Sequence, residues 1–149
     1  MNTFLTPSIC SYGALRRATR GIGQLYDGMI GSAGINAAQY NLLHTISRLD
    51  APTQSKLAGE MVMDLSALGH TLKPLIRDGL VASRKDNEDA RRRRITLTKA
   101  GEAKLHEAEM LWKQAQKRFD SLVGRTTARE FREMLDQLAS PKFAEQFLA

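Results

Sequence analysis

Four consecutive arginines, Arg91 to Arg94, run directly into Ile95-Thr-Leu-Thr98, where apolar and polar side chains alternate. Such alternation is typical of a half-buried β-strand. Arginines repel one another, so a strand gains no stability from four of them in a row. A guanidinium group binds phosphate oxygens with paired hydrogen bonds, and clusters of such groups are typical of polyanion sites. Phosphate binding at the mouth of a strand is therefore the first chemistry that the sequence suggests.

The net charge of +6 is concentrated in the middle third of the chain. Residues 1–52 carry four basic and two acidic side chains, residues 53–99 carry ten and six, and residues 100–149 carry eight and eight. Localised positive charge suggests a polyanionic partner, with nucleic acid the first candidate. Solubility is the alternative explanation, and charge alone does not decide between the two.

Length and composition limit the class of protein. A chain of 149 residues with 42% hydrophobic residues suits one globular domain. No run approaches the roughly 18 apolar residues that a membrane span needs, and residues 1–10 lack the pattern of a signal peptide. The single cysteine excludes an intramolecular disulfide. We expect a soluble, cytoplasmic protein of a reducing compartment that makes no contact with a membrane.

Hydrophobic spacing predicts a mainly α-helical chain with one β-hairpin. Helices are expected over residues 8–30, 36–49, 54–60, 64–78 and 99–123, with two more after Thr127 and Ser140. Strands are expected over 80–85 and 94–98. Polar residues that suit helix starts are Ser8, Asn36, Thr53, Thr98 and a capping box from Thr127 to Glu130. This order of elements predicts a winged helix-turn-helix with long N- and C-terminal helices.

The two ends of the chain are predicted to form one unit and the middle another. The expected helix over residues 99–123 is apolar along one stripe, and such a stripe needs a surface to bury it. We expect a helical dimerisation region over residues 1–34 and 99–149. A DNA-binding winged helix is expected over residues 35–98. A monomeric helical bundle is the alternative.

Several motifs resemble those of the MarR family of bacterial transcriptional regulators. Residues 89–91, DAR, are similar to the family's D-x-R wing signature, and residues 95–101, ITLTKAG, to the LT-x-x-G that opens its fifth helix. Residues 72–81, LKPLIRDGLV, resemble the end of its recognition helix and the start of its wing. The resemblance covers nearly the whole chain. It implies a homodimer that binds double-stranded DNA, in most members a repressor, and in many released by a small ligand.

The resemblance also assigns roles in DNA binding. Arg91 would enter the minor groove, with Asp89 holding it in position. Side chains of a strand alternate, so we expect two of the four arginines to reach DNA directly and the others to contact phosphates or the protein's own acids. The predicted DNA-binding residues are Ser66, Ala67, His70, Thr71, Lys73, Arg77, Asp89, Arg91, Arg92, Arg93 and Arg94.

Within the predicted recognition helix, polar residues divide into two groups. Ser66, His70 and Thr71 are the candidates for hydrogen bonds to base edges, because the start of such a helix meets the bases. Lys73 and Arg77 lie further along and are expected to meet phosphates, which position the protein without specifying sequence. The family's commoner arginine and threonines are replaced here in part, so the bases that are read stay open.

An effector site is implied between the dimerisation helices and the winged helix. The candidates for it are polar or amphipathic side chains: Arg16, Tyr26, Tyr40, His44 and Trp112. A small aromatic or carboxylate compound is the expected ligand. The alternative is that Tyr40 and Trp112 are ordinary core residues.

Cys10 suggests a redox alternative. One branch of the family senses organic peroxide through an N-terminal cysteine whose thiolate is held by tyrosines, and Tyr12, Tyr26 and Tyr40 are present here. Cys10 lies about two residues too early for that motif, and the tyrosine pattern is incomplete. A lone cysteine is more often a small apolar residue.

Catalysis is not expected. The histidines His44, His70 and His106 lie on different predicted helices at no metal-like spacing, and no phosphate-binding loop, nucleophile elbow or Cys/His cluster is present. We therefore expect no enzymatic activity, no metal and no cofactor. A winged helix that binds protein instead of DNA is a further alternative, but it would leave the four arginines unexplained.

Overall fold

The computed structural model describes residues 9–149 and has the mainly helical winged-helix architecture that the sequence predicts. Its elements, in chain order, are α1 (Ser11–Ile30), η1 (Gly31–Ala33), α2 (Ala37–Leu49), α3 (Gln54–Glu60), α4 (Leu65–Arg77), β1 (Val81–Lys85), β2 (Arg93–Leu97), α5 (Lys99–Val123), α6 (Arg125–Leu138) and α7 (Pro141–Leu148). None of the helices in this part of the chain combines the length and apolar character that crossing a bilayer requires.

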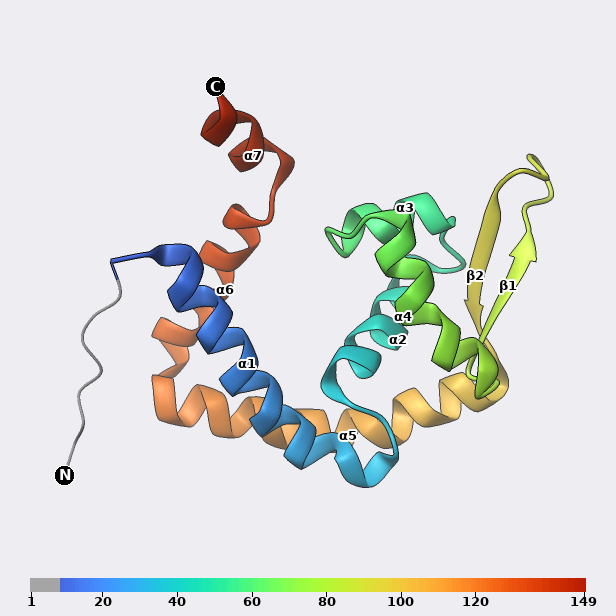
Figure 1. Cartoon of the computed structure of the whole chain (residues 1–149). Coiled ribbons are helices and arrows are strands. Elements are labelled where there is room, and N and C mark those ends of the chain that lie inside the picture. Colours follow the sequence, from blue (N-terminus) through green and yellow to red (C-terminus); the bar gives the residue numbers. More distant parts are fainter. Residues whose placement is uncertain (1–8) are drawn as a thin grey trace.

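The long helix α5 joins the two halves of the molecule (Figure 1). The helices α2, α3 and α4 and the hairpin lie over its N-terminal half. The helix α1 runs along its C-terminal half, and α6 and α7 turn away from that end (Figure 1). The β-hairpin forms a wing whose tip points away from the helices (Figure 1).

Polar caps fix the helix starts in the winged helix. Asn36 and Gln39 form a reciprocal capping box on α2. The backbone amide of Gln39 donates to Asn36 Oδ1 at 2.8 Å, and the backbone amide of Asn36 donates to Gln39 Oε1 at 3.0 Å. The side chains of Thr53, Asp64 and Thr98 accept backbone hydrogen bonds at the starts of α3, α4 and α5. The predicted caps at Asn36, Thr53 and Thr98 are therefore confirmed.

Two predicted helix starts near the chain ends are wrong. Residues 9 and 10 are not helical and α1 begins at Ser11 with Cys10 as its N-cap, whereas the predicted cap Ser8 lies outside the described residues. The helix α6 begins at Arg125 without a side-chain cap, so Thr127 lies inside its first turn. Gly124, at φ 92°, explains the second error, because this residue alone separates the end of α5 from the start of α6.

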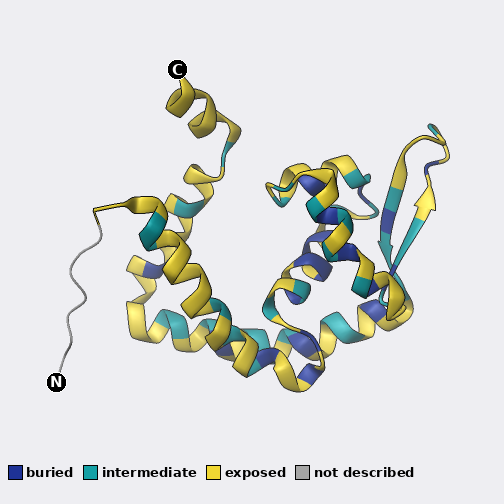
Figure 2. Cartoon of the chain, viewed as in Figure 1, coloured by how far each residue is buried: buried dark blue, intermediate teal, exposed yellow. Residues whose placement is uncertain are grey.

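The hydrophobic core lies mainly in the winged helix, where the buried residues gather in Figure 2. On α4, Leu68, Leu72 and Leu75 recur at helical spacing and are all buried, so one face of this helix points inward. Its core partners include Leu42, Leu43, Ile46, Leu57, Val81 and Ile95. The opposite face of α4 is left exposed.

The hairpin is antiparallel, with Val81 opposite Leu97 and Lys85 opposite Arg93. Its strands lie within a residue of the predicted bounds. The turn between α2 and α3 extends the sheet, because the Ile95 amide donates to the Pro52 carbonyl at 2.9 Å and Thr53 pairs with Arg94 as an isolated bridge. The wing is therefore attached to the helix-turn-helix along one edge.

A close backbone contact joins the winged helix to α5. A Cβ atom on Gly101 would lie 2.0 Å from the Leu80 carbonyl oxygen, closer than any real Cβ contact. The Thr98 amide donates to the same carbonyl at 3.1 Å, and the Thr98 hydroxyl donates to the Gly79 carbonyl at 2.6 Å. Only glycine fits at position 101, which gives the LT-x-x-G motif a physical reason.

The flanking helices are tied together by a chain of polar contacts. The Tyr26 hydroxyl of α1 donates to Gln116 Oε1 of α5 at 3.2 Å. Gln116 Nε2 and Arg132 Nη1 of α6 both donate to Asp120 Oδ1, at 2.9 and 3.0 Å. This chain fixes α1, α5 and α6 relative to one another where few large apolar side chains are buried between them.

Candidate nucleic-acid interface

The exposed face of α4 carries the polar residues that the sequence singled out. Ser66, His70, Lys73 and Arg77 are all exposed and follow one another at spacings of four, three and four residues. Residues at these spacings lie on one face of a helix, opposite the buried leucines. The structure therefore brings four predicted DNA-binding residues into one exposed stripe.

The remaining predicted residues of α4, Ala67 and Thr71, are half-buried at the edge of this stripe. The Thr71 hydroxyl donates to the Ala67 carbonyl at 2.9 Å. Its only proton is thus used within the helix, and Thr71 has lone pairs alone to offer a base. Ser66 and His70 are better placed to donate a hydrogen bond.

The two cations of α4 differ in their surroundings. Arg77 Nε lies 2.9 Å from Asp78 Oδ1, and the hydrogen bond from Arg77 lowers the pKa of the Asp78 carboxyl. Among the described residues Lys73 has no acidic partner within ion-pair distance. Lys73 therefore presents a full positive charge at the middle of the stripe, whereas the charge of Arg77 is partly balanced.

Arg91 lies at the tip of the wing with its side chain 95% exposed. Asp89 Oδ1 accepts a hydrogen bond from the Arg91 amide at 3.0 Å and lies 3.4 Å from Arg91 Nε. Asp89 Oδ2 lies 3.6 Å from Arg92 Nε. Asp89 thus contacts both exposed arginines, in the arrangement that the resemblance implies for Asp89 and Arg91.

Arg93 and Arg94 are hydrogen-bonded to the protein itself. Arg93 donates to the Ser83 hydroxyl at 3.0 Å and to the Ser83 carbonyl at 2.9 Å. Arg94 donates to the Ala51 carbonyl at 3.0 Å and to Asp86 Oδ2 at 3.4 Å. The structure therefore separates Arg91 and Arg92, whose guanidinium groups are ion-paired with Asp89, from Arg93 and Arg94, whose guanidinium groups are hydrogen-bonded to backbone carbonyls and other side chains. Arg93 stays exposed and Arg94 is half-buried.

Like charges face each other across the hairpin. Arg84 lies opposite Arg94, and Lys85 lies opposite Arg93. Like charges at directly opposed positions destabilise a hairpin, so the wing keeps this charge at a cost to its own stability. Such a surface favours an anionic partner.

Asp86 is a buried acid of the wing that the sequence analysis did not predict as a site residue. Its side chain is only 5% exposed. The Glu88 amide donates to Asp86 Oδ1 at 3.2 Å, and this hydrogen bond, with a further contribution from Arg94, lowers the pKa of the Asp86 carboxyl despite its burial. The pair Asp86-Asn87 is a turn signal, because an aspartate side chain can accept a hydrogen bond from the backbone two residues on. That signal could have identified this residue.

Four of the five predicted effector residues line one cavity of about 230 Å³ between α1, α2 and α5. The Tyr40 ring stacks on Trp112 and His44, with centroids 5.8 and 6.1 Å apart. Burial raises the pKa of both Tyr26 and Tyr40. The lining residues are Tyr26, Ile30, Ala37, Tyr40, Asn41, His44 and Trp112.

The fifth predicted effector residue, Arg16, lies elsewhere. It is on the N-terminal half of α1 and donates to the Tyr12 hydroxyl at 3.0 Å, with its guanidinium over the Tyr12 ring. Sequence reasoning missed Ile30, Ala37 and Asn41 as lining residues. Their identity depends on where α1 and α2 cross, which no local pattern reports.

Two of the three tyrosines considered for redox sensing, Tyr26 and Tyr40, lie away from Cys10 within the chain. Cys10 is exposed and caps α1, with its Sγ accepting from the Gly13 amide at 3.4 Å. Tyr26 is sixteen residues further along the chain, or about 24 Å at the rise of a helix. Tyr40 lies in α2 against Trp112.

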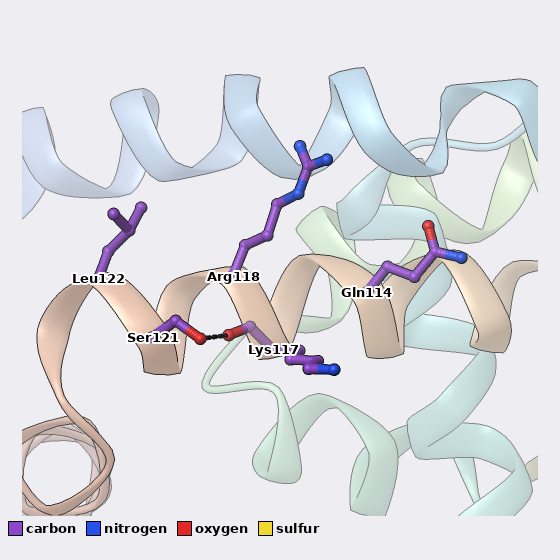
Figure 3. A pocket seen from close by; sticks show the side chains of 5 residues that line it. All are labelled: Gln114, Lys117, Arg118, Ser121 and Leu122. Atoms are coloured by element: carbon purple, nitrogen blue, oxygen red, sulfur yellow. Dashed lines mark hydrogen bonds between the residues drawn. The ribbon is translucent and has the colours of Figure 1, made fainter.

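A further hollow runs along the C-terminal half of α5, with a volume of about 560 Å³ (Figure 3). All of its lining side chains are exposed, and one hydrogen bond joins the Ser121 hydroxyl to the Lys117 carbonyl at 2.8 Å. It is open surface and not an enclosed site. Within residues 9–149, no three His, Cys, Asp or Glu side chains are grouped so as to hold a metal ion.

Comparison with known proteins places this geometry in a family. The sequence model described as the MarR family matches residues 35–92. The structure of the M. tuberculosis transcriptional regulator MosR in complex with DNA is similar to this chain, at 33% identity and a TM-score of 0.81, covering 92% of this chain and 97% of that one.

Two further proteins are similar to this chain. The HTH-type transcriptional regulator PetP of Rhodobacter capsulatus is 28% identical over 133 residues, which are 87% of this chain and 78% of PetP. A variant of MarR from E. coli, solved with operator DNA, has the same fold at 20% identity and a TM-score of 0.76, covering 85% of this chain and 91% of that one.

The fold, the family match and the similarity to MosR define a winged-helix transcriptional regulator. The chain belongs to the MarR family.

Proposed function

We propose that this protein binds a pseudo-palindromic DNA operator as a homodimer, represses transcription in the cytoplasm, and is released by a small-molecule effector. The observation that carries the DNA-binding part is the exposed stripe of α4 beside the exposed arginines of the wing. A helix of this kind fits the major groove, and an arginine beside it suits the negative potential of a narrow minor groove. MosR and MarR, which share this fold, were solved with DNA.

The roles proposed for the residues follow from their exposure. Ser66 and His70 would read base edges, because both are exposed at the N-terminal half of α4. Lys73 and Arg77 would contact phosphates, and Arg91 would enter the minor groove with Asp89 at its side. Base contacts give sequence preference, whereas phosphate contacts give affinity for any duplex.

The test begins by selecting bound duplexes from a random pool with the wild-type protein. Two-fold symmetry predicts a pseudo-palindrome whose half-sites lie about one helical turn apart. Arg91→Ala should weaken binding to many sequences, whereas His70→Ala should cost about 1–3 kcal/mol at particular base pairs. Lys142→Ala, which removes an exposed cation of α7, is the control and should bind as the wild type does. An unchanged affinity for Arg91→Ala in mobility-shift titrations would contradict the proposal.

Dimerisation is supported by apolar side chains that the single chain leaves exposed. Contiguous exposed apolar surface usually marks a site of association. An open apolar hollow of about 450 Å³ lies between α1, α2, α5 and α6, and another of about 360 Å³ lies between α1 and α5. The exposed large apolar residues of these helices are Tyr12, Leu15, Ile22, Leu25, Met110, Leu122, Val123, Phe131, Met134 and Leu138.

Effector binding is supported by the cavity that contains Tyr26, Tyr40, His44 and Trp112. Its aromatic walls and its hydroxyl and imidazole groups suit a small aromatic acid. The cavity lies between α5 and the winged helix, so a ligand that prefers one arrangement of the two would change DNA affinity. A coupling of about 1–3 kcal/mol is enough for release.

The effector proposal is tested by titrating aromatic acids into the complex with the selected duplex. Release should be lost in Trp112→Ala and His44→Ala, with DNA affinity in the absence of ligand retained. Arg16→Ala is the matched control, because its side chain lies outside this cavity. Equal release from all three variants would place the ligand elsewhere.

A further inference from the structure

We infer that Arg94 is a positioning residue that fixes the wing against the helix-turn-helix, and that it does so through Asp86 and not by contacting DNA. This rests on the proposed function, because it concerns how the wing is presented to a duplex.

The Arg94 guanidinium bridges two segments that are distant in sequence. Nη1 donates to the Ala51 carbonyl at 3.0 Å, in the turn between α2 and α3. Nη2 donates to Asp86 Oδ2 at 3.4 Å, just beyond the end of β1. One side chain therefore connects both strands of the wing to the turn that precedes the helix-turn-helix.

Asp86 is held so that its carboxylate faces Arg94. Its amide donates to the Arg92 carbonyl at 3.0 Å, and its Oδ1 accepts from the Glu88 amide. The Asp86 side chain is 5% exposed, whereas that of Arg94 is 39% exposed, so the carboxylate is the shielded member of the pair. Leaving a buried carboxylate without its cation is strongly unfavourable, so this pair is expected to stay formed.

The turn that Arg94 contacts has a strained backbone. Asp50 and Ala51 are consecutive non-glycine residues in the left-handed region, at φ 52° and 54°. Such residues persist only where surrounding contacts hold them. The Arg94 hydrogen bond to Ala51, together with that of Ile95 to Pro52, supplies such contacts.

The consequence is a fixed separation between two DNA-facing elements. The helix α3 starts directly after this turn and α4 follows it, so Arg94 links the wing to the recognition helix. Arg91, by contrast, is 95% exposed at the far end of the wing. A wing that is already held in place loses less conformational entropy when it binds DNA, so its affinity is higher.

Asp86→Asn and Glu88→Gln separate positioning from charge. Both substitutions remove one negative charge from the same loop, and both leave every wing cation in place. If Arg94 were a phosphate contact restrained by Asp86, Asp86→Asn would free it and strengthen binding. If Arg94 positions the wing, Asp86→Asn weakens affinity for the selected duplex on the order of ten-fold. Glu88→Gln, whose side chain is exposed, should leave the affinity unchanged or improve it by up to about three-fold.

Arg94→Lys provides a second test, because it keeps the charge and loses the two-armed guanidinium. We expect it to weaken binding about as much as Asp86→Asn does, and the double variant to be no weaker than either single variant. The Ile95 amide hydrogen should exchange faster in both single variants than in the wild type. The melting temperatures of both variants should stay close to that of the wild type. This readout separates a detached wing from a generally unfolded protein.

The outcomes distinguish the two proposals. If the wild type binds the duplex but Asp86→Asn binds it more tightly, the role proposed for Arg94 is wrong and the proposed function stands. Additive losses in the double variant would lead to the same conclusion. A wild-type protein that binds no duplex would overturn the proposed function and this inference with it.

Discussion

The winged helix and the helices that flank it differ in how far their large apolar side chains are buried. The winged helix buries large residues such as Leu42, Leu57 and Leu75, and leaves only Val62, Leu65 and Ile76 exposed. In the flanks, the buried residues among those described are small apart from Ile30. Their large apolar side chains are mostly exposed (Figure 2). The comparison suggests that the winged helix closes its own core, whereas the flanks need a second subunit to close theirs.

The largest expected effect is at the joint between the two regions. Gly101→Ala places a Cβ on the Leu80 carbonyl, which must displace either α5 or the start of the wing. We expect a loss of about 3 kcal/mol or more in the free energy of unfolding, measured by urea denaturation. Gly59→Ala is the control, since a Cβ there meets nothing within 4 Å, and it should stabilise by up to about 1 kcal/mol. Similar stabilities for the two variants would show that the joint is not tight.

The need for a second subunit is tested next. Leu122→Asp places a charge at an apolar side chain of α5 that is 88% exposed in the single chain. The dimer dissociation constant should rise on the order of 100-fold, as measured by sedimentation equilibrium. Val62→Ser alters a side chain that is 68% exposed in the winged helix, and it should leave the assembly unchanged. If Leu122→Asp assembles as the wild type does, the flanks are closed in another way.

The winged helix has a second strained point, at Val62, in addition to the turn at Asp50 and Ala51. This β-branched residue has φ 52° in the turn between α3 and α4, where glycine is favoured. Val62→Gly should therefore stabilise the protein by about 1 kcal/mol in urea denaturation. A loss of stability would contradict this account, because it would show that the backbone strain at Val62 is smaller than the entropy that glycine adds to the unfolded chain.

The smallest expected effect is the response of stability to acid. Among the carboxylates whose pKa the fold lowers, Asp86 and Asp120 represent the two regions. The hydrogen bond from Glu88 lowers the pKa of Asp86 in the winged helix, and the hydrogen bonds from Arg132 and Gln116 lower that of Asp120 in the flanks. The pKa of each carboxylate is lower in the folded state than in the unfolded state. Their contribution to the free energy of unfolding is therefore present above the unfolded pKa of about 3.9, and it is lost as pH falls through the folded-state pKa. Thermal melting should thus be insensitive to these groups above about pH 5. Asp86→Asn and Asp120→Asn should each make the decline below about pH 4 shallower, and an unchanged decline would contradict this.

Local patterns were enough to predict most of the winged helix. Leu68, Leu72 and Leu75 repeat at helical spacing, and the caps Asn36 and Thr53 act over three residues, so both can be read from neighbouring positions. The wing was predicted because polar turn residues separate two short strand-like segments. The same reasoning placed Ser66, His70, Lys73 and Arg77 on one helix, where the structure aligns them.

What local patterns could not predict has tertiary causes. One partner of Arg94 is the Ala51 carbonyl, which is 43 residues away in sequence and comes close only when the wing docks on the turn after α2. Arg16 was grouped with the cavity residues, but the crossing of α1 over α5 places it elsewhere. The apparent capping box at Thr127 failed because Gly124 already ends one helix and starts the next.

The central claim is that two copies of the chain hold one duplex through α4 and the wing. Sedimentation of the protein with the selected duplex, over about 50 to 200 mM salt, tests it most directly. We predict a complex of two chains per duplex whose affinity falls by on the order of 10³-fold across this range, because phosphate contacts release bound counterions. A protein that stays a single chain and leaves the duplex unbound at the lowest salt would contradict the account.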